Sequence, residues 1–188
     1  MKYRSFIAVS PSHGILHAAQ KLIKQLRPVA GDVRWTKPEN LHFTLQFLGD
    51  VDVLEIPALS AAVNEAAREV EAFEMEVRGT GAFPAIDRPR TLWLGAAEGA
   101  ESMVALQTAI QDRLHHLGFR GESRRYIPHL TLGRVTRSAS PRALSQELSK
   151  LADFEAGKML VDEVTVYSSQ LSAEGPTYDV LAHAPLAE

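Results

Sequence analysis

The chain has 188 residues, a formal net charge of −3 and no cysteine. The lack of cysteine excludes disulfide bonds, thiol catalysis and cysteine-ligated zinc or iron–sulfur sites. Because the net charge is slightly negative, contact with a nucleic acid would need a local basic patch. A solvated surface and a binding site are equally good interpretations of an arginine cluster in the second half of the chain. The cluster consists of Arg120, Arg124, Arg125, Arg134, Arg137 and Arg142.

Length and hydropathy predict one domain that spans residues 1–188. Hydrophobic residues make up 45% and charged residues 23% of the chain, which is ordinary for a globular protein with a sizeable core. The apolar run at residues 3–9 is too short and too soon interrupted for a signal peptide. No stretch approaches the ~20 apolar residues that span a bilayer. We therefore expect a cytoplasmic monomer without membrane contact.

The first half of the chain alternates strands and helices. Ser10-Pro11-Ser12 offers a helix start after a β-branched strand, and apolar residues then recur at helical spacing. The glycines at Gly79 and Gly81 and the proline at Pro84 predict a loop. We predict strands at residues 3–9, 33–35, 41–48 and 73–77, and helices at residues 10–28 and 53–72.

The second half repeats this mixture. Gly118 has the character of a residue just beyond a helix end, and Ser140-Pro141 offers another helix start. We predict strands at residues 90–95, 127–135, 154–160, 163–171 and 178–182, and helices at residues 101–117 and 140–151. The order of elements suggests two related α+β lobes and not two independent domains.

Two similar segments stand out, about half the chain apart. The first is Asn40-Leu41-His42-Phe43-Thr44-Leu45, and the second is Pro128-His129-Leu130-Thr131-Leu132-Gly133-Arg134. On a strand, the histidine and the threonine of each motif share one face, and the apolar residues take the other. We expect the apolar residues to anchor each strand in a core, and the two His-Thr pairs to face one cleft.

Two facing histidines suit proton transfer at both ends of an in-line displacement. An imidazole has an unperturbed pKa of about 6.5, so both of its protonation states exist near neutral pH. Threonine hydroxyls can donate to the non-bridging oxygens of a phosphate group, and nearby arginines can add charge-assisted contacts. This arrangement requires no metal.

Structural readings compete with this hypothesis. A lone histidine in an apolar strand is more often a satisfied core residue, but two matched copies in similar contexts argue against that reading. A zinc site that uses both histidines is disfavoured, because no carboxylate stands at ligand spacing from them. We interpret four of the remaining histidines as surface residues, namely His13, His17, His115 and His116. The sequence around His183 indicates no role for it.

The chain resembles the two-histidine (2H) phosphoesterase superfamily, which two His-x-Thr/Ser-x motifs define. Within it, the chain looks like the RNA 2′,3′-cyclic phosphodiesterase family, also called the 2′-5′ RNA ligase family. The resemblance covers nearly the whole chain. The matching segments are Arg4-x-Phe6-x-Ala8, residues 40–45 with Phe47-Leu48-Gly49, Gly81-x-Phe83-Pro84, Pro89-Arg90-x-Leu92-Trp93-Leu94-Gly95, residues 128–134, Tyr167-x-Ser169 and Gly175-x-x-Tyr178.

The resemblance implies a bilobal α+β fold with antiparallel sheets around a central cleft and helices outside. It implies cofactor-free, metal-independent hydrolysis of a 2′,3′-cyclic phosphate on RNA or a nucleotide to a 2′-phosphate, with 2′-5′ RNA ligation as a related reaction. His42 would then be the proton donor to O3′, and His129 the proton acceptor from water. Thr44 and Thr131 would hold the phosphate oxygens.

Further substrate-binding residues are suggested by position alone. Arg124 and Arg125 lie just before the second motif and Arg134 lies just after it. Strict alternation from the second histidine turns Arg134 to the opposite face, so we favour Arg125 or Arg124 for phosphate contact. Arg90 has a similar status as a candidate for substrate contact. Trp93 is suited to stacking on a base, although a core tryptophan is an equally good interpretation.

Two alternative functions stay open. One is an enzyme whose physiological substrate is another small cyclic phosphodiester, such as the cyclic phosphate of ADP-ribose. The chain is also compatible with an RNA-end-binding protein that has lost catalysis. The two complete His-x-Thr pairs argue against the second alternative, because binding alone does not need two proton carriers.

Overall fold

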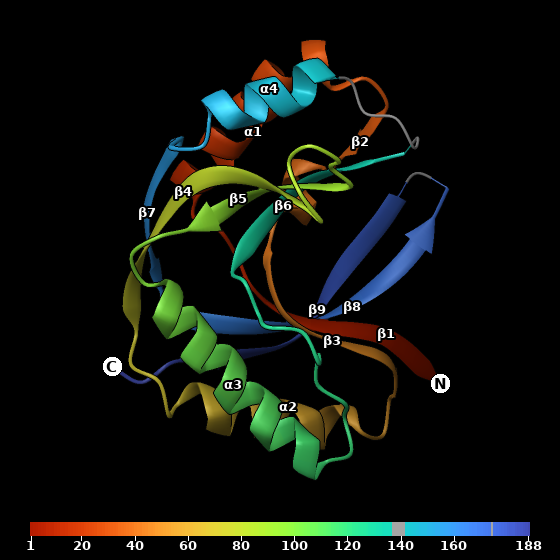
Figure 1. The fold of residues 1–188 in the computed structure, drawn as a ribbon. Coiled ribbons are helices and arrows are strands. Elements are labelled where there is room, and N and C mark those ends of the chain that lie inside the picture. The colour runs from red at the N-terminus through yellow and green to blue at the C-terminus, as the bar shows by residue number, and fades with distance from the viewer. Residues whose placement is uncertain (137–141, 174) are drawn as a thin grey trace.

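In the computed structural model, which describes residues 1–136, 142–173 and 175–188, two antiparallel half-sheets meet at the histidine motifs (Figure 1). The strands are β1 (Lys2–Val9), β2 (Val33–Trp35), β3 (Phe43–Asp52), β4 (Phe73–Phe83), β5 (Thr91–Ala96), β6 (His129–Val135), β7 (Glu155–Val161), β8 (Glu163–Ser172) and β9 (Gly175–Pro185). The helices are α1 (His13–Ala30), α2 (Ile56–Ala67), α3 (Ala100–His116) and α4 (Arg142–Lys150), with a 3-10 turn, η1, at Pro38–Asn40.

The strands follow the order β7-β4-β5-β6-β3-β1-β8-β9. Outside this order, β2 pairs with residues 133–135 of β6. The link between β3 and β6 is one residue pair, Phe43 opposite Leu130, and both side chains are fully buried. We call β3, β1, β8 and β9 the first lobe, and β7, β4, β5, β6 and β2 the second lobe. The junction therefore places the middle residue of one motif against the middle residue of the other.

Each lobe is covered by one helix from the first half of the chain and one from the second half. Helix α1 contacts β7 and α4, and α4 contacts β4, so both cover the second lobe. Helices α2 and α3 pack together, and α2 also contacts β8 and β9 of the first lobe (Figure 1). No helix among the described residues is long and apolar enough to cross a membrane.

The sequence pattern explains why α1 forms and how it docks. The hydroxyl of Ser12 accepts a hydrogen bond from the Ile15 amide, which caps the first turn. Leu22 and Leu26 lie on the buried face and are fully inaccessible to solvent. Each buried leucine contributes about 2 kcal/mol to stability through the apolar area that it removes from water. The predicted helix is thus confirmed, with its end two residues beyond Pro28.

The predicted α+β class is confirmed, and most predicted elements are found near their expected positions. One prediction is wrong: Gly79 and Gly81 do not begin a loop, because β4 continues to Phe83. Gly79 has a φ of 84° where the pairing of β4 shifts, and Gly81 leaves the space that a neighbouring indole fills. Arg137 and Ser140-Pro141 lie outside the described residues.

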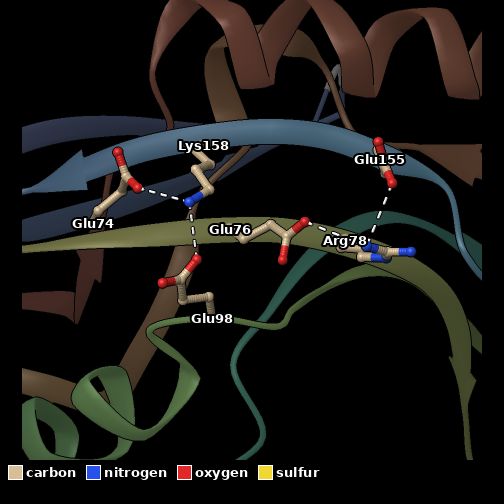
Figure 2. A network of polar contacts seen from close by, with 6 residues as sticks. All are labelled: Glu74, Glu76, Arg78, Glu98, Glu155 and Lys158. Atoms are coloured by element: carbon tan, nitrogen blue, oxygen red, sulfur yellow. Dashed lines mark hydrogen bonds and ion pairs between the residues drawn. The ribbon is translucent and has the colours of Figure 1, made fainter.

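Acidic side chains gather toward the outer edge of the second lobe, on β4, on β7 and on the segment between β5 and α3 (Figure 2). The Lys158 ammonium lies 2.9 Å from carboxylate oxygens of both Glu74 and Glu98. Arg78 holds two further glutamates in the same way. Since these pairs are largely exposed, each adds little to stability. Each carboxylate in this group nevertheless lies within ion-pair distance of Arg78 or Lys158, so its negative charge is offset locally.

Candidate active site

The two histidines are held in the same way. His42 Nδ1 lies 2.7 Å from the carbonyl oxygen of Asn40, and His129 Nδ1 lies 2.7 Å from the carbonyl oxygen of Ile127. A carbonyl oxygen only accepts hydrogen bonds, so the Nδ1 atom of each ring carries the proton and donates. Each neutral imidazole is thereby fixed in one tautomer, with Nε2 as its free, proton-accepting nitrogen.

Both motif strands carry a β-bulge at the same motif position. On β3, Ile7 and Ala8 of β1 pair with Gln46 and Thr44, which leaves Leu45 as the extra residue. On β6, Leu92 and Trp93 of β5 pair with Gly133 and Thr131, which leaves Leu132 as the extra residue. From each histidine onward the burial pattern is identical: half-buried, buried, half-buried, buried, buried, exposed. The two motif strands are therefore related by pseudo-symmetry, residue by residue, from His42 to Phe47 and from His129 to Arg134.

The bulge overturns one expectation from the sequence. Strict alternation places Arg134 on the face opposite His129, but the extra residue at Leu132 resets the alternation. Arg134 consequently lies on the same face as Thr131, and both line the main cleft. Phe47 takes the equivalent position on β3, where its side chain is 57% exposed and lines the same cleft.

The cleft between the lobes has a volume of about 490 Å³ and contains three of the four predicted catalytic residues, His42, Thr44 and Thr131. His129 shares the face of Thr131, two residues away on β6. The described lining residues of the cleft include no aspartate or glutamate. They include four cationic side chains, namely Arg4, Arg34, Lys37 and Arg134. In a chain with a net charge of −3, this is a local cationic site that suits an anion.

Aromatic rings support both imidazoles. The His42 ring centroid lies 4.8 Å from that of Phe6 and 5.4 Å from that of Tyr178. The His129 ring centroid lies 5.0 Å from that of Phe83, which approaches edge-on. These contacts restrict the orientation of the two imidazole rings. The rings belong to the matching segments Arg4-x-Phe6, Gly81-x-Phe83 and Gly175-x-x-Tyr178, although the sequence did not assign them a role.

Burial lowers the pKa of His42 from 6.5 to about 4, since the charged imidazolium loses hydration. The Asn40 carbonyl opposes this effect, and the positive charges of His129 and Arg134 reinforce it. Burial likewise lowers the pKa of His129, opposed by the Ile127 carbonyl and reinforced by Arg134. Both imidazoles are therefore mostly neutral at pH 7 in the empty cleft.

The arginines favoured by sequence do not line the cleft. Arg124 and Arg90 are exposed elsewhere, and Arg125 lines a second cavity of about 640 Å³ together with Trp93. The Trp93 indole packs over Gly81, where a Cβ atom would lie 2.2 Å from the ring. It also lies beside the ring of His129, at a centroid distance of 6.3 Å. Substrate contact by Arg90, Trp93, Arg124 or Arg125 stays a prediction without geometric support.

The other histidines lie outside the cleft lining. His13, His17, His115 and His116 are exposed, and His183 contacts a glutamate on the neighbouring strand. Among the described residues, no group of three histidine, cysteine, aspartate or glutamate side chains could hold a metal ion. The zinc hypothesis for the paired histidines thus lacks the ligand set that it needs.

Two His-x-Thr motifs on pseudo-symmetric strands that face one cationic cleft define a two-histidine phosphoesterase. The family model of the 2′-5′ RNA ligase superfamily matches residues 16–172. The chain therefore belongs to the 2′-5′ RNA ligase superfamily.

Relatives and solved structures agree with this membership. The chain is 36% identical over 178 residues to an RNA 2′,3′-cyclic phosphodiesterase of Methanothermobacter thermautotrophicus, covering 95% of this chain and 96% of that protein. It is 32% identical to an RNA 2′,3′-cyclic phosphodiesterase of Thermotoga maritima, covering 95% of this chain and 92% of that protein. The structure of TT0787 of Thermus thermophilus is similar, with a TM-score of 0.81, 28% identity and 97% coverage of both chains. The fold of E. coli LigT is also similar, with a TM-score of 0.79, 23% identity and full coverage of both chains.

Proposed function

We propose that this protein hydrolyses the 2′,3′-cyclic phosphate at the end of an RNA strand and leaves a 2′-phosphate. The observation that carries the proposal is the matched pair of imidazoles, each with Nδ1 bound to a backbone carbonyl, at a cleft whose described lining residues include four cations and no carboxylate. The relatives named above, which bear this activity in their names, support it.

The proposed reaction moves one proton at each end of an in-line displacement. His129 Nε2 accepts a proton from water as the water oxygen attacks phosphorus. The bond between phosphorus and O3′ breaks, and His42 Nε2 gives its proton to O3′. One P–O bond forms and one breaks, and the two histidines regain their starting protonation states by exchange with solvent.

In this proposal three side chains hold the phosphate. Thr44 and Thr131 present hydroxyl groups from the two lobes, and Arg134 adds a guanidinium from the same strand face. Such donors stabilise the charge that gathers on the non-bridging oxygens in the transition state. Arg134 Nη1 also donates to the Thr91 hydroxyl over 3.0 Å, which restrains the guanidinium.

Substrate binding would favour the protonated form of His42 that the reaction needs. In the free protein, burial holds the His42 pKa at about 4, so the imidazole is neutral at pH 7. A cyclic phosphodiester brings one negative charge beside the ring, and a nearby opposite charge favours the protonated form. The enzyme would therefore take up a proton with its substrate.

Ligation uses the same arrangement with a different nucleophile. A 5′-hydroxyl group that replaces water beside His129 would form a 2′-5′ phosphodiester bond, with O3′ again as the leaving group. The roles of His42 and His129 stay the same in both reactions. The balance between the two products would depend on which nucleophile occupies the space beside His129.

The first test is the product of a defined 2′,3′-cyclic substrate. We expect a 2′-phosphate, and a 3′-phosphate would reject the assignment of O3′ as leaving group. His42→Ala and His129→Ala should each reduce turnover by roughly 10²–10⁴, the usual range for loss of a general acid or base. His17→Ala, on an exposed helix face, is the matched control. Activity that disappears in EDTA would contradict the metal-independent mechanism.

The alternatives predict different results. A phosphodiesterase for ADP-ribose cyclic phosphate would show a higher kcat/KM on that compound than on oligonucleotides. An RNA-end-binding protein would bind oligonucleotides and form no product from a 2′,3′-cyclic phosphate end. We further propose one domain across residues 1–188, supported by the sheet that joins both lobes. A cytoplasmic monomer is a separate proposal that rests on the sequence alone. Sedimentation of the purified protein tests the monomer.

A further inference from the structure

Two arginines stand directly opposite each other at the edge of the cleft. In the antiparallel pairing of β2 with β6, Arg34 is the partner of Arg134. Directly opposed residues share a sheet face with Cβ atoms ~5 Å apart, and like charges in that position are destabilising. Among the described residues, no carboxylate forms an ion pair with either guanidinium, and both line the cleft.

The sheet imposes this opposition. Gly133, beside Arg134, lets β2 approach closely: a Cβ atom there would lie 3.0 Å from the Arg34 carbonyl oxygen and 2.8 Å from a Val33 methyl carbon. The Thr36 amide donates to the Leu132 carbonyl over 2.9 Å and extends the pairing. Because the backbone is fixed on both sides, the two arginines cannot separate by a simple loop movement.

A third cation lines the same cleft. Lys37 is exposed and precedes η1, the turn that leads to His42. The charge of Arg134 lowers the pKa values of both histidines, so we assign Arg134 to the reacting phosphate. Arg34 and Lys37 line the cleft without being among the charges that act on the histidines, so they offer positive charge for a second phosphate.

We propose that Arg34, assisted by Lys37, binds the internucleotide phosphate on the 5′ side of the terminal nucleotide. This inference rests on the proposed function. It predicts that the enzyme acts on the cyclic phosphate of an oligonucleotide end more efficiently than on that of a mononucleotide. Two neighbouring phosphates of one strand would lie against Arg134 and Arg34 and offset the repulsion between the guanidiniums. Arginine suits this role because its planar group can contact phosphate oxygens in a bidentate manner.

The test compares two substrates that differ by one phosphate: a nucleoside 2′,3′-cyclic monophosphate and a dinucleotide that ends in the same cyclic group. Arg34→Gln should lower kcat/KM on the dinucleotide by about tenfold or more, as expected for loss of a charge-assisted contact. The kcat/KM of the same variant on the mononucleotide should stay within about twofold of the wild-type value. The slope of log kcat/KM against log salt on the dinucleotide should weaken by about 0.7, one single-strand phosphate contact. Arg68→Gln, exposed after α2, is the control.

Equal losses on both substrates would overturn the proposal, because Arg34 would then act at the reacting phosphate or on the fold. Unchanged kcat/KM on both would overturn it as well. If the wild-type protein turns over neither substrate, the proposed function fails, and calorimetric binding of a 2′-phosphorylated dinucleotide and mononucleotide decides the inference instead. Arg34→Gln must then weaken dinucleotide binding alone, and any other pattern rejects the phosphate contact.

Discussion

Acidification should destabilise this protein in part by protonating His42. The histidine has a pKa of 6.5 in an unfolded chain, and burial lowers it to about 4 in the folded protein. Below pH 6.5 the unfolded state therefore binds more protons than the folded state. The contribution of neutral His42 to stability is fully present above pH 6.5 and is lost as the pH falls toward 4. The loss amounts to about 2 kcal/mol at pH 5 and about 3 kcal/mol at pH 4, at 1.36 kcal/mol per pH unit.

Urea unfolding at pH 7 and pH 5 measures this effect. The free energy of unfolding of wild-type protein should fall by about 2 kcal/mol more than that of His42→Gln, because other titrating groups are common to both proteins. His17→Gln removes an exposed histidine and should retain the full wild-type pH dependence. Equal losses in wild type and His42→Gln would refute the reasoning, since burial would then not depress the His42 pKa.

Three further predictions address the cleft and its frame. Thr131→Val should lower kcat/KM by about tenfold or more, as expected for loss of a transition-state hydrogen-bond donor, while the urea midpoint changes little; unchanged initial rates would contradict the phosphate contact. Gly133→Ala should lower the free energy of unfolding by about 1–3 kcal/mol, because its Cβ atom would meet Val33 and the Arg34 carbonyl. Gly14→Ala, where the nearest atom lies 3.9 Å from the new Cβ, should be neutral or stabilising by up to about 1 kcal/mol; similar losses in both variants would exclude the close strand approach as the cause. Since both histidine pKa values are lowered in the free enzyme, the pH optimum of kcat/KM should lie below 6.5, and that of kcat should lie higher, because the bound anion favours imidazolium. Coincident optima would show that the phosphate does not raise these pKa values.

The motif residues illustrate what a single sequence can predict. His42 and Thr44 were predicted to share a face, and the structure places both at the cleft with Phe43 buried behind them. That prediction succeeded because period-two alternation depends on the local backbone alone. The same rule failed for Arg134, five residues beyond its histidine, because a bulge lies between them.

The glycines show a related limit. Gly79 and Gly81 are read as loop residues when only local propensity is considered. In the folded chain Gly79 absorbs a shift in strand pairing, and Gly81 makes room for the Trp93 indole on the next strand. Neither role is visible without the neighbouring strand, so the predicted end of β4 was too early.

The amino-acid sequence alone predicts two His-x-Thr motifs on strands that their apolar neighbours bury, and it carries a family resemblance that the comparisons confirm. That Arg134 lines the cleft with His42, and that Arg34 stands opposite Arg134, follows only from how the strands pair in the folded chain. The same is true of the lowered pKa of His42, which leaves its imidazole neutral at pH 7. The reason is physical, because strand register and desolvation arise from segments that are distant in the chain and meet only on folding.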